Sequence, residues 1–187
     1  MNTQVAHLFA SKKKKVISSE TVRISNLPRK TKNAVDLTKK LKTPTGSMRL
    51  RTIQSEALIE AETTGGLIAL IGCGHGKTLI TLLLGRMMRK KRVLLLVPAS
   101  LREKTHAEAL TYKEHFDFEI PHIISYQKLS RPSGLRILQD LSPDLIICDE
   151  AHHLKDMSSV RTKRLAKYLV QHAKCAYVAM SGTLYNR

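Results

Sequence analysis

Residues Ile71-Gly72-Cys73-Gly74-His75-Gly76-Lys77-Thr78 form a glycine-rich stretch that ends in Gly-Lys-Thr. The apolar run over residues 66–71 predicts a buried strand before it, and the pattern over residues 78–89 predicts a helix after it. Because glycine has no Cβ, the three glycines let the backbone turn tightly and point successive N–H groups at one anion. At a strand-to-helix junction this stretch predicts a phosphate-binding loop at a helix N-terminus.

The residues of this loop have distinct expected roles toward a nucleotide. Lys77 brings a flexible positive charge to the β- and γ-phosphates, and the Thr78 hydroxyl is a ligand for Mg²⁺. Ile71 stands where the strict P-loop (Walker A) pattern has its first glycine, so a glycine-rich turn without a ligand is the alternative. The loop residues expected to bind nucleotide are Gly72, Cys73, Gly74, His75, Gly76, Lys77 and Thr78.

A second motif places two carboxylates at the end of a predicted strand. Four apolar residues lead into Asp149-Glu150, an arrangement of the Walker B type. Asp149 is expected to hold Mg²⁺, and Glu150 is expected to orient or deprotonate the attacking water. Lys77, Asp149 and Glu150 are therefore the candidate catalytic residues of an ATP hydrolase that uses ATP and Mg²⁺.

Beyond residue 48 the chain alternates between apolar runs and helical patterns. Near-continuous apolar strands separated by helices predict an α/β fold with a mostly parallel sheet and helices on both faces. Loops at the carboxyl ends of such strands form the ligand crevice, so distant motifs should converge there. The predicted strands are residues 66–71, 92–97, 118–125 (an edge strand, given Pro121), 144–149 and 175–180. The predicted helices are residues 52–62, 78–89, 99–112, 135–141 and 158–172.

The first part of the chain is strongly basic. Residues 1–51 contain 13 of the 32 lysines and arginines but 2 of the 15 acidic residues, and the net charge is +17. Turn-forming residues over 44–47 mark a boundary. We therefore expect a partly disordered basic N-terminal arm over residues 1–45 and an ATP-binding domain over residues 46–187. Such an arm suits a polyanion such as nucleic acid, although a solvated tail is an equal alternative.

Three cysteines without a C-x-x-C pair favour a reducing, intracellular compartment, either cytoplasmic or, in a eukaryotic host, nuclear. No apolar run approaches the roughly 18 residues that a membrane span needs, so no membrane partner is expected. The small aromatic fraction, 4%, disfavours recognition of single strands by base stacking and favours backbone-phosphate contacts.

The ordered motifs over residues 48–186 resemble the first RecA-like lobe of superfamily-2 helicases and translocases. The matching segments are residues 50–54, 72–78, 95–101, 124–129, 149–152 (the DEAH box) and 181–183. The resemblance implies that Gln54 reads adenine and that four residues couple nucleotide to nucleic acid, namely His152, Ser181, Gly182 and Thr183. It also implies nucleic-acid contacts at Pro98, Ala99, Ser100 and Tyr126.

Within that superfamily, His153-Leu154-Lys155-Asp156 and the segment after it are similar to Swi/Snf-type translocases, which implies duplex DNA as partner. Family members carry a second RecA-like lobe, which we expect in a longer chain or in another polypeptide. The expected function is the motor lobe of a nucleic-acid-dependent ATPase. The alternatives are a nucleotide-responsive nucleic-acid binding module that does not hydrolyse ATP, and an RNA helicase lobe.

Overall fold

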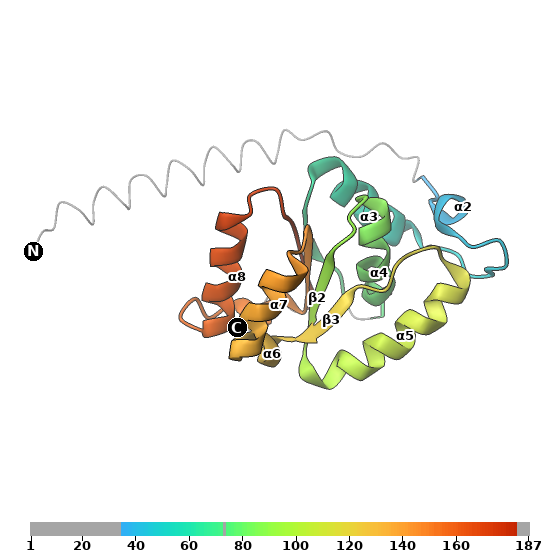
Figure 1. Cartoon of the computed structure of the whole chain (residues 1–187). Coiled ribbons are helices and arrows are strands. Elements are labelled where there is room, and N and C mark those ends of the chain that lie inside the picture. Colours follow the sequence, from blue (N-terminus) through green and yellow to red (C-terminus); the bar gives the residue numbers. More distant parts are fainter. Residues whose placement is uncertain (1–34, 73, 183–187) are drawn as a thin grey trace, which may run out of the picture. The chain divides into compact units, whose positions relative to one another are not determined.

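The computed structural model describes residues 35–72 and 74–182, and within them a five-stranded parallel sheet forms the centre of the fold (Figure 1). The strand order is β1-β5-β4-β2-β3, and every pairing is parallel. The strands are β1 (Leu67–Leu70), β2 (Val93–Val97), β3 (His122–Ser125), β4 (Leu145–Asp149) and β5 (Ala176–Ser181). This confirms the predicted parallel α/β architecture, with β3 at an edge.

Helices cover both faces of the sheet, and each face has its own apolar cluster (Figure 1). The first cluster includes buried side chains of α3 (Thr52–Thr64), α4 (Lys77–Met87) and α5 (Arg102–His115). The second cluster includes buried side chains of α6 (Tyr126–Ser130), α7 (Pro132–Leu141) and α8 (Val160–Gln171). Successive strand residues alternate between the clusters, because neighbouring side chains of a strand point to opposite faces.

Strand β4 shows how the apolar runs produce this core. All five of its residues are buried, and its register with β2 places Ile146 beside Leu94 and Cys148 beside Leu96. Burial on both faces explains why β4 and β2 appear in the sequence as continuous apolar runs rather than as alternating patterns. A helix-covered central strand then ends at Asp149, at the carboxyl edge of the sheet.

Several predicted elements differ from the observed ones at their ends. The third strand begins at His122 rather than at residue 118, directly after Pro121, which has no N–H for a sheet ladder. The helix expected over residues 99–112 begins as a 3-10 turn, η1 (Ala99–Leu101), and continues as α5. Two short elements after residue 48 were not predicted, α6 and the 3-10 turn η2 (Ala151–Leu154).

The packed structure begins earlier than the boundary predicted at residues 45 and 46. The short helix α2 (Thr38–Leu41) brings Leu37 and Leu41 into the first cluster, where they are 5% and 2% exposed. Lys42 also forms an antiparallel bridge with Phe116. Residues 37–42 therefore belong to the folded unit rather than to the basic arm. Residues 1–34 of the predicted arm lie outside the described residues.

Among the residues that the structure describes, no helix is both long and apolar enough to cross a membrane.

Candidate active site

The predicted motifs meet at the carboxyl edge of the sheet. Strand β1 leads into the glycine-rich loop, β4 ends at Asp149, and β5 ends at Ser181. Since β5 lies between β1 and β4, the three strand ends are neighbours although their motifs are far apart in the sequence. The convergence expected from a parallel sheet is thus present.

The loop adopts the backbone that its glycines allow. Gly74 and Gly76 have φ angles of +80° and +73°, in the left-handed region that residues with a Cβ avoid. Gly76 is the N-cap of α4, so the first N–H groups of that helix lack partners within the helix and its positive dipole end faces the loop. Gly72 and His75 are exposed, Thr78 is partly exposed, and Cys73 lies outside the described residues.

Two residues of the α3 N-terminus fasten this loop. The Gln54 side chain is 4% exposed, and its Nε2 donates to the Gly76 carbonyl at 3.1 Å while its Oε1 accepts from the Arg51 N–H at 2.8 Å. Arg51 Nη1 donates to the Gly74 carbonyl at 2.7 Å. Both ends of the Gln54 amide therefore bond to main chain, which makes it a clip between α3 and the loop.

Lys77 reaches back toward the end of β4. Its Nζ donates to the Ile71 carbonyl at 3.1 Å and lies 3.4 Å from Oε1 of Glu150. The Lys77 and Glu150 side chains are 11% and 19% exposed. A pair with this little solvent around it is screened less than a surface ion pair.

Glu150 is the hub of a hydrogen-bonded group that links β4 to β5. Its Oε2 accepts from Ser181 Oγ at 3.1 Å and from the Gly182 N–H at 3.4 Å. His152 Nδ1 lies 3.3 Å from the same Glu150 oxygen and 3.3 Å from Ser181 Oγ. Three of the four expected coupling residues thus contact the expected catalytic carboxylate, and the fourth, Thr183, lies outside the described residues.

The two carboxylates have opposite electrostatic environments. Burial, together with the neighbouring Glu150 charge, raises the pKa of Asp149 to about 6. Burial also acts to raise the pKa of Glu150, but the Lys77 charge and the hydrogen bonds from Ser181 and Gly182 outweigh it and lower the pKa. Glu150 is therefore ionised at neutral pH, and its backbone is held in the left-handed region at φ +53°. A non-glycine residue in that region is a form of strain that concentrates at functional sites.

The expected nucleic-acid contacts separate into two groups. Ala99 and Ser100 are exposed and Pro98 is partly exposed, so they remain candidates. Tyr126 is fully buried, and its hydroxyl donates to the Asp149 carbonyl at 2.7 Å. The prediction for Tyr126 is wrong for that reason: its side chain supports the end of β4 instead of facing a ligand.

Sequence reasoning missed this support and the loop contact of Arg51. Arg51 directly precedes the predicted helix of residues 52–62, and its guanidinium is the kind of side chain that reaches a neighbouring carbonyl, but no sequence pattern identifies its partner. Tyr126 belongs to a short mixed segment whose periodicity does not say which side chains face inward. Both roles depend on contacts between segments distant in the chain.

The donor set at the edge suits a hard divalent cation. Asp149 contributes a carboxylate that is 8% exposed, and Thr78 contributes a hydroxyl in the first turn of α4. Mg²⁺ prefers oxygen ligands and takes few of them from the protein when phosphates and waters supply the others. In the described part of the chain no three His, Cys, Asp or Glu side chains form a metal cluster.

The chain is similar to a known protein family in sequence and to a solved structure in fold. The family model described as type III restriction enzyme, res subunit (ResIII), matches residues 36–186. A crystal structure of the UvsW helicase from bacteriophage T4 is similar in fold, with a TM-score of 0.58 and 18% sequence identity over 79% of this chain. The aligned part spans 58% of the UvsW chain, which is less than two thirds of it. No curated protein matches the chain in sequence.

Proposed function

The chain belongs to the ResIII family, that of type III restriction enzyme res subunits, and from this premise we propose that it is the ATP-hydrolysing motor lobe of a superfamily-2 nucleic-acid-dependent ATPase. The observation that carries the proposal is the Lys77–Glu150 contact of 3.4 Å. It places a phosphate-loop lysine beside a carboxylate suited to act on water, next to a second carboxylate suited to Mg²⁺.

Each group at the edge has a task in this proposal. Lys77 and the free N–H groups at the start of α4 hold the phosphates of ATP. Thr78 and Asp149 supply oxygen ligands for Mg²⁺, which when bound neutralises phosphate charge. Glu150 orients the attacking water and accepts its proton. The lowered pKa keeps Glu150 ionised at neutral pH but also makes it a weaker base. Its strength as a base therefore depends on the groups that lower its pKa.

The arrival of phosphates provides a way to change those partners. Lys77 is the only cation paired with Glu150 among the described lysines and arginines, and phosphate oxygens compete for the same ammonium group. When Lys77 turns to phosphate, the Glu150 carboxylate keeps the hydrogen bonds from Ser181 and Gly182 but loses its strongest counter-charge. Its pKa then rises, which makes it a better base when ATP is bound.

The Glu150–Ser181–His152 group is the proposed link between the nucleotide and nucleic acid. Ser181 is the last residue of β5, so a displacement of Glu150 is transmitted to the chain that continues from β5. Thr183 belongs to the same motif. Duplex DNA is the proposed partner, following the Swi/Snf-like sequence after the DEAH box, with Pro98, Ala99 and Ser100 as contacts at the same edge.

Fast turnover further requires positive charge against the transferred phosphoryl group, which motor enzymes of this superfamily take from a second RecA-like lobe. We propose that this lobe comes from a longer chain or a separate polypeptide.

Gln54 is proposed to read the adenine base as well as to clip the loop, since its amide NH₂ has a second hydrogen and its oxygen a second lone pair.

Nucleotide binding by Lys77→Ala tests the proposal at the residue that carries it. Titration with a fluorescent ATP analogue and Mg²⁺ should show at least tenfold weaker binding than the native chain, because a charge-assisted contact to phosphate is lost. Lys163→Ala removes an exposed lysine of α8 and serves as the matched control. Equal affinities for the Lys77 and Lys163 variants would contradict the proposed site.

Comparing duplex DNA with duplex RNA as stimulants of ATP hydrolysis separates the DNA translocase from the RNA helicase.

A further inference from the structure

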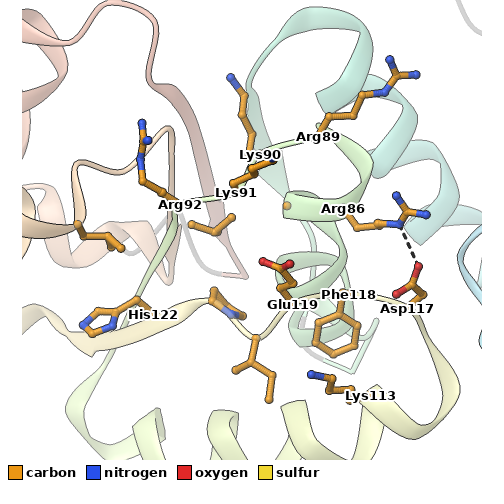
Figure 2. Close-up of a pocket in the computed structure, with 15 residues that line it drawn as sticks. Arg86, Arg89, Lys90, Lys91, Arg92, Lys113, Asp117, Phe118, Glu119 and His122 are labelled. Atoms are coloured by element: carbon orange, nitrogen blue, oxygen red, sulfur yellow. Dashed lines mark ion pairs between the residues drawn. The ribbon is translucent and has the colours of Figure 1, made fainter.

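A hollow of about 750 Å³ lies at the amino edge of the sheet, the edge opposite the phosphate loop (Figure 2). It is bordered by the end of α4, the turn between α4 and β2, the end of α5, and the first residues of β2 and β3. None of the proposed catalytic or nucleotide-binding residues lines it. We call this feature the basic hollow.

The rim of the basic hollow is strongly cationic. Two carboxylates line it, those of Asp117 and Glu119, and Asp117 pairs with Arg86 at 3.2 Å (Figure 2). Among the described residues no ion pair is found for the other five cations of the rim, namely Arg89, Lys90, Lys91, Arg92 and Lys113. The six cations of the rim are Arg86, Arg89, Lys90, Lys91, Arg92 and Lys113.

The nearby carboxylate of Asp144 bonds to backbone groups of this turn and forms no ion pair with the described side chains of the rim. It accepts from the backbone N–H groups of Lys91 and Arg92, at 3.3 Å and 2.9 Å. These bonds fix the backbone of the turn, and the Arg92 Nε donates to the Ser142 carbonyl at 2.7 Å. The turn is therefore held through its backbone groups and a neutral carbonyl, and the lysine ammonium groups remain available to an anion.

The dipole of α4 does not account for the cations either. That dipole favours cations within the last helical turn, and the effect falls off beyond it. Arg86 is the basic residue of the last turn, whereas Lys90 and Lys91 follow the end of the helix at Met87. In addition, Arg89 has φ +55°, at a position after a helix where glycine is the usual residue.

The apolar lining of the hollow is continuous with the core. Phe118 is 4% exposed, and Val93 and Ile120 are partly buried against the same core cluster. In Figure 2 Arg92 lies on one side of the hollow, and Arg86 and Arg89 lie on the other. The cations are therefore spread along the rim instead of converging on one point, and this arrangement suits a ligand with several phosphates.

We propose that the basic hollow binds the phosphodiester backbone of a nucleic acid, as a second contact separate from the carboxyl edge. Lys90, Lys91 and Lys113 bind phosphate oxygens. Arg86 and Arg92 keep their bonds to Asp117 and Ser142 and position the protein segments around the hollow. Contacts of this kind carry little sequence information and weaken as salt rises. Binding here does not require nucleotide hydrolysis, so it can be tested separately from the proposed ATPase activity.

Lysine footprinting on the full chain gives a residue-resolved test. The protein is treated with an amine-acetylating reagent with and without a 20-base-pair DNA duplex, and modification is measured by mass spectrometry. We expect at least threefold protection of Lys90, Lys91 and Lys113 by the duplex, with exposed Lys163 and Lys167 of α8 unprotected. If DNA left the modification of the three rim lysines unchanged, or protected Lys163 and Lys167 to the same extent, the proposal would be overturned.

Paired charge reversals give a second, independent readout. Lys90→Glu with Lys91→Glu should weaken duplex binding by about tenfold or more at 0.1 M salt and lower the slope of log K against log salt by about two. Lys163→Glu with Lys167→Glu makes the same change in net charge away from the hollow. Equal weakening by the two pairs would mean general attraction only and would overturn the proposal. Lys90→Gln with Lys91→Gln covers the case in which the reversal does not fold.

Pyrophosphate distinguishes the two sources of phosphate. If pyrophosphate protects the rim lysines and the duplex does not, the hollow takes a small phosphorylated ligand and the nucleic-acid proposal is wrong. Protection by the duplex that persists in Lys77→Ala is the expected result, and it separates this contact from the nucleotide site.

Discussion

The ammonium group of Lys77 lies 3.4 Å from the carboxylate of Glu150 and joins the start of α4 to the end of β4. Through Glu150 the same contact extends to Ser181 at the end of β5. Three chain segments are thereby held by one polar group at the edge where the phosphate loop lies. A change in any one of the three segments should therefore alter the geometry of this edge.

Glu150→Gln should bind Mg²⁺–ATP about fivefold more tightly than the native chain, since a partly buried ion pair of about 1 kcal/mol no longer competes for Lys77. Titration with a fluorescent ATP analogue measures this. Glu114→Gln, at an exposed position on α5, is the matched control and should bind like the native chain. Weaker binding by Glu150→Gln would show that phosphate and Glu150 do not compete for Lys77.

Gly76→Ala should destabilise the fold more than Gly74→Ala. Both positions have positive φ, which costs a residue with a Cβ about 1 kcal/mol. At Gly76 the new Cβ would also collide with Nε2 of Gln54, whereas at Gly74 it would meet nothing within 4 Å. Chemical denaturation should therefore show a loss of about 2 to 3 kcal/mol for Gly76→Ala and about 1 kcal/mol for Gly74→Ala. Equal losses would mean that the Gln54 clip is not rigid.

Tyr126→Phe should lower both stability and activity. It removes the buried hydrogen bond of 2.7 Å to the Asp149 carbonyl, at a cost of about 1 to 2 kcal/mol. Tyr168→Phe, on α8 and away from the edge, removes a similar bond of 3.1 Å to the Pro143 carbonyl and is the matched control. Denaturation midpoints should fall in both variants, while ATP turnover should fall in Tyr126→Phe alone. An unchanged rate of ATP turnover in Tyr126→Phe would mean that Tyr126 contributes to stability but not to activity.

Asp149→Asn should stabilise the protein in EDTA at neutral pH. The pKa of Asp149 is about 6 in the folded state against 3.8 as its ordinary value, so the folded state binds its proton more tightly. The native chain therefore loses stability as pH rises from about 4 to about 6, by at most about 3 kcal/mol, and the Asp149→Asn variant would avoid this loss. Denaturation at pH 4 and pH 7 should show the advantage of the variant at pH 7. An advantage that does not grow with pH would contradict the raised pKa.

Much of the site could be predicted from sequence because its parts obey local rules. Gly65 ends α3 in the left-handed conformation that glycine favours, a few residues after the predicted end of that helix at residue 62. Asp149 follows a run of apolar residues, and the parallel arrangement of such runs brings strand ends to one edge. The positions of the loop, of Asp149 and of Ser181 follow from these rules.

The contacts between these parts did not follow from the sequence. The partners of Lys77, Gln54 and Tyr126 depend on how the strands align and on where α3 and α6 pack, and no local pattern encodes that arrangement. The same holds for Leu37 and Leu41, whose short helix lies in a basic segment without clear periodicity. Their burial depends on a surface that forms only after the sheet and its helices have packed.

The most direct test of the central claim is ATP hydrolysis by this chain together with the proposed second lobe, with and without duplex DNA, beside a Glu150→Gln control. We predict turnover that rises at least tenfold with DNA and falls at least a hundredfold in the control, because the water-activating carboxylate is lost while ATP still binds. DNA-stimulated turnover that survives Glu150→Gln unchanged would contradict the assignment of this edge as the catalytic site.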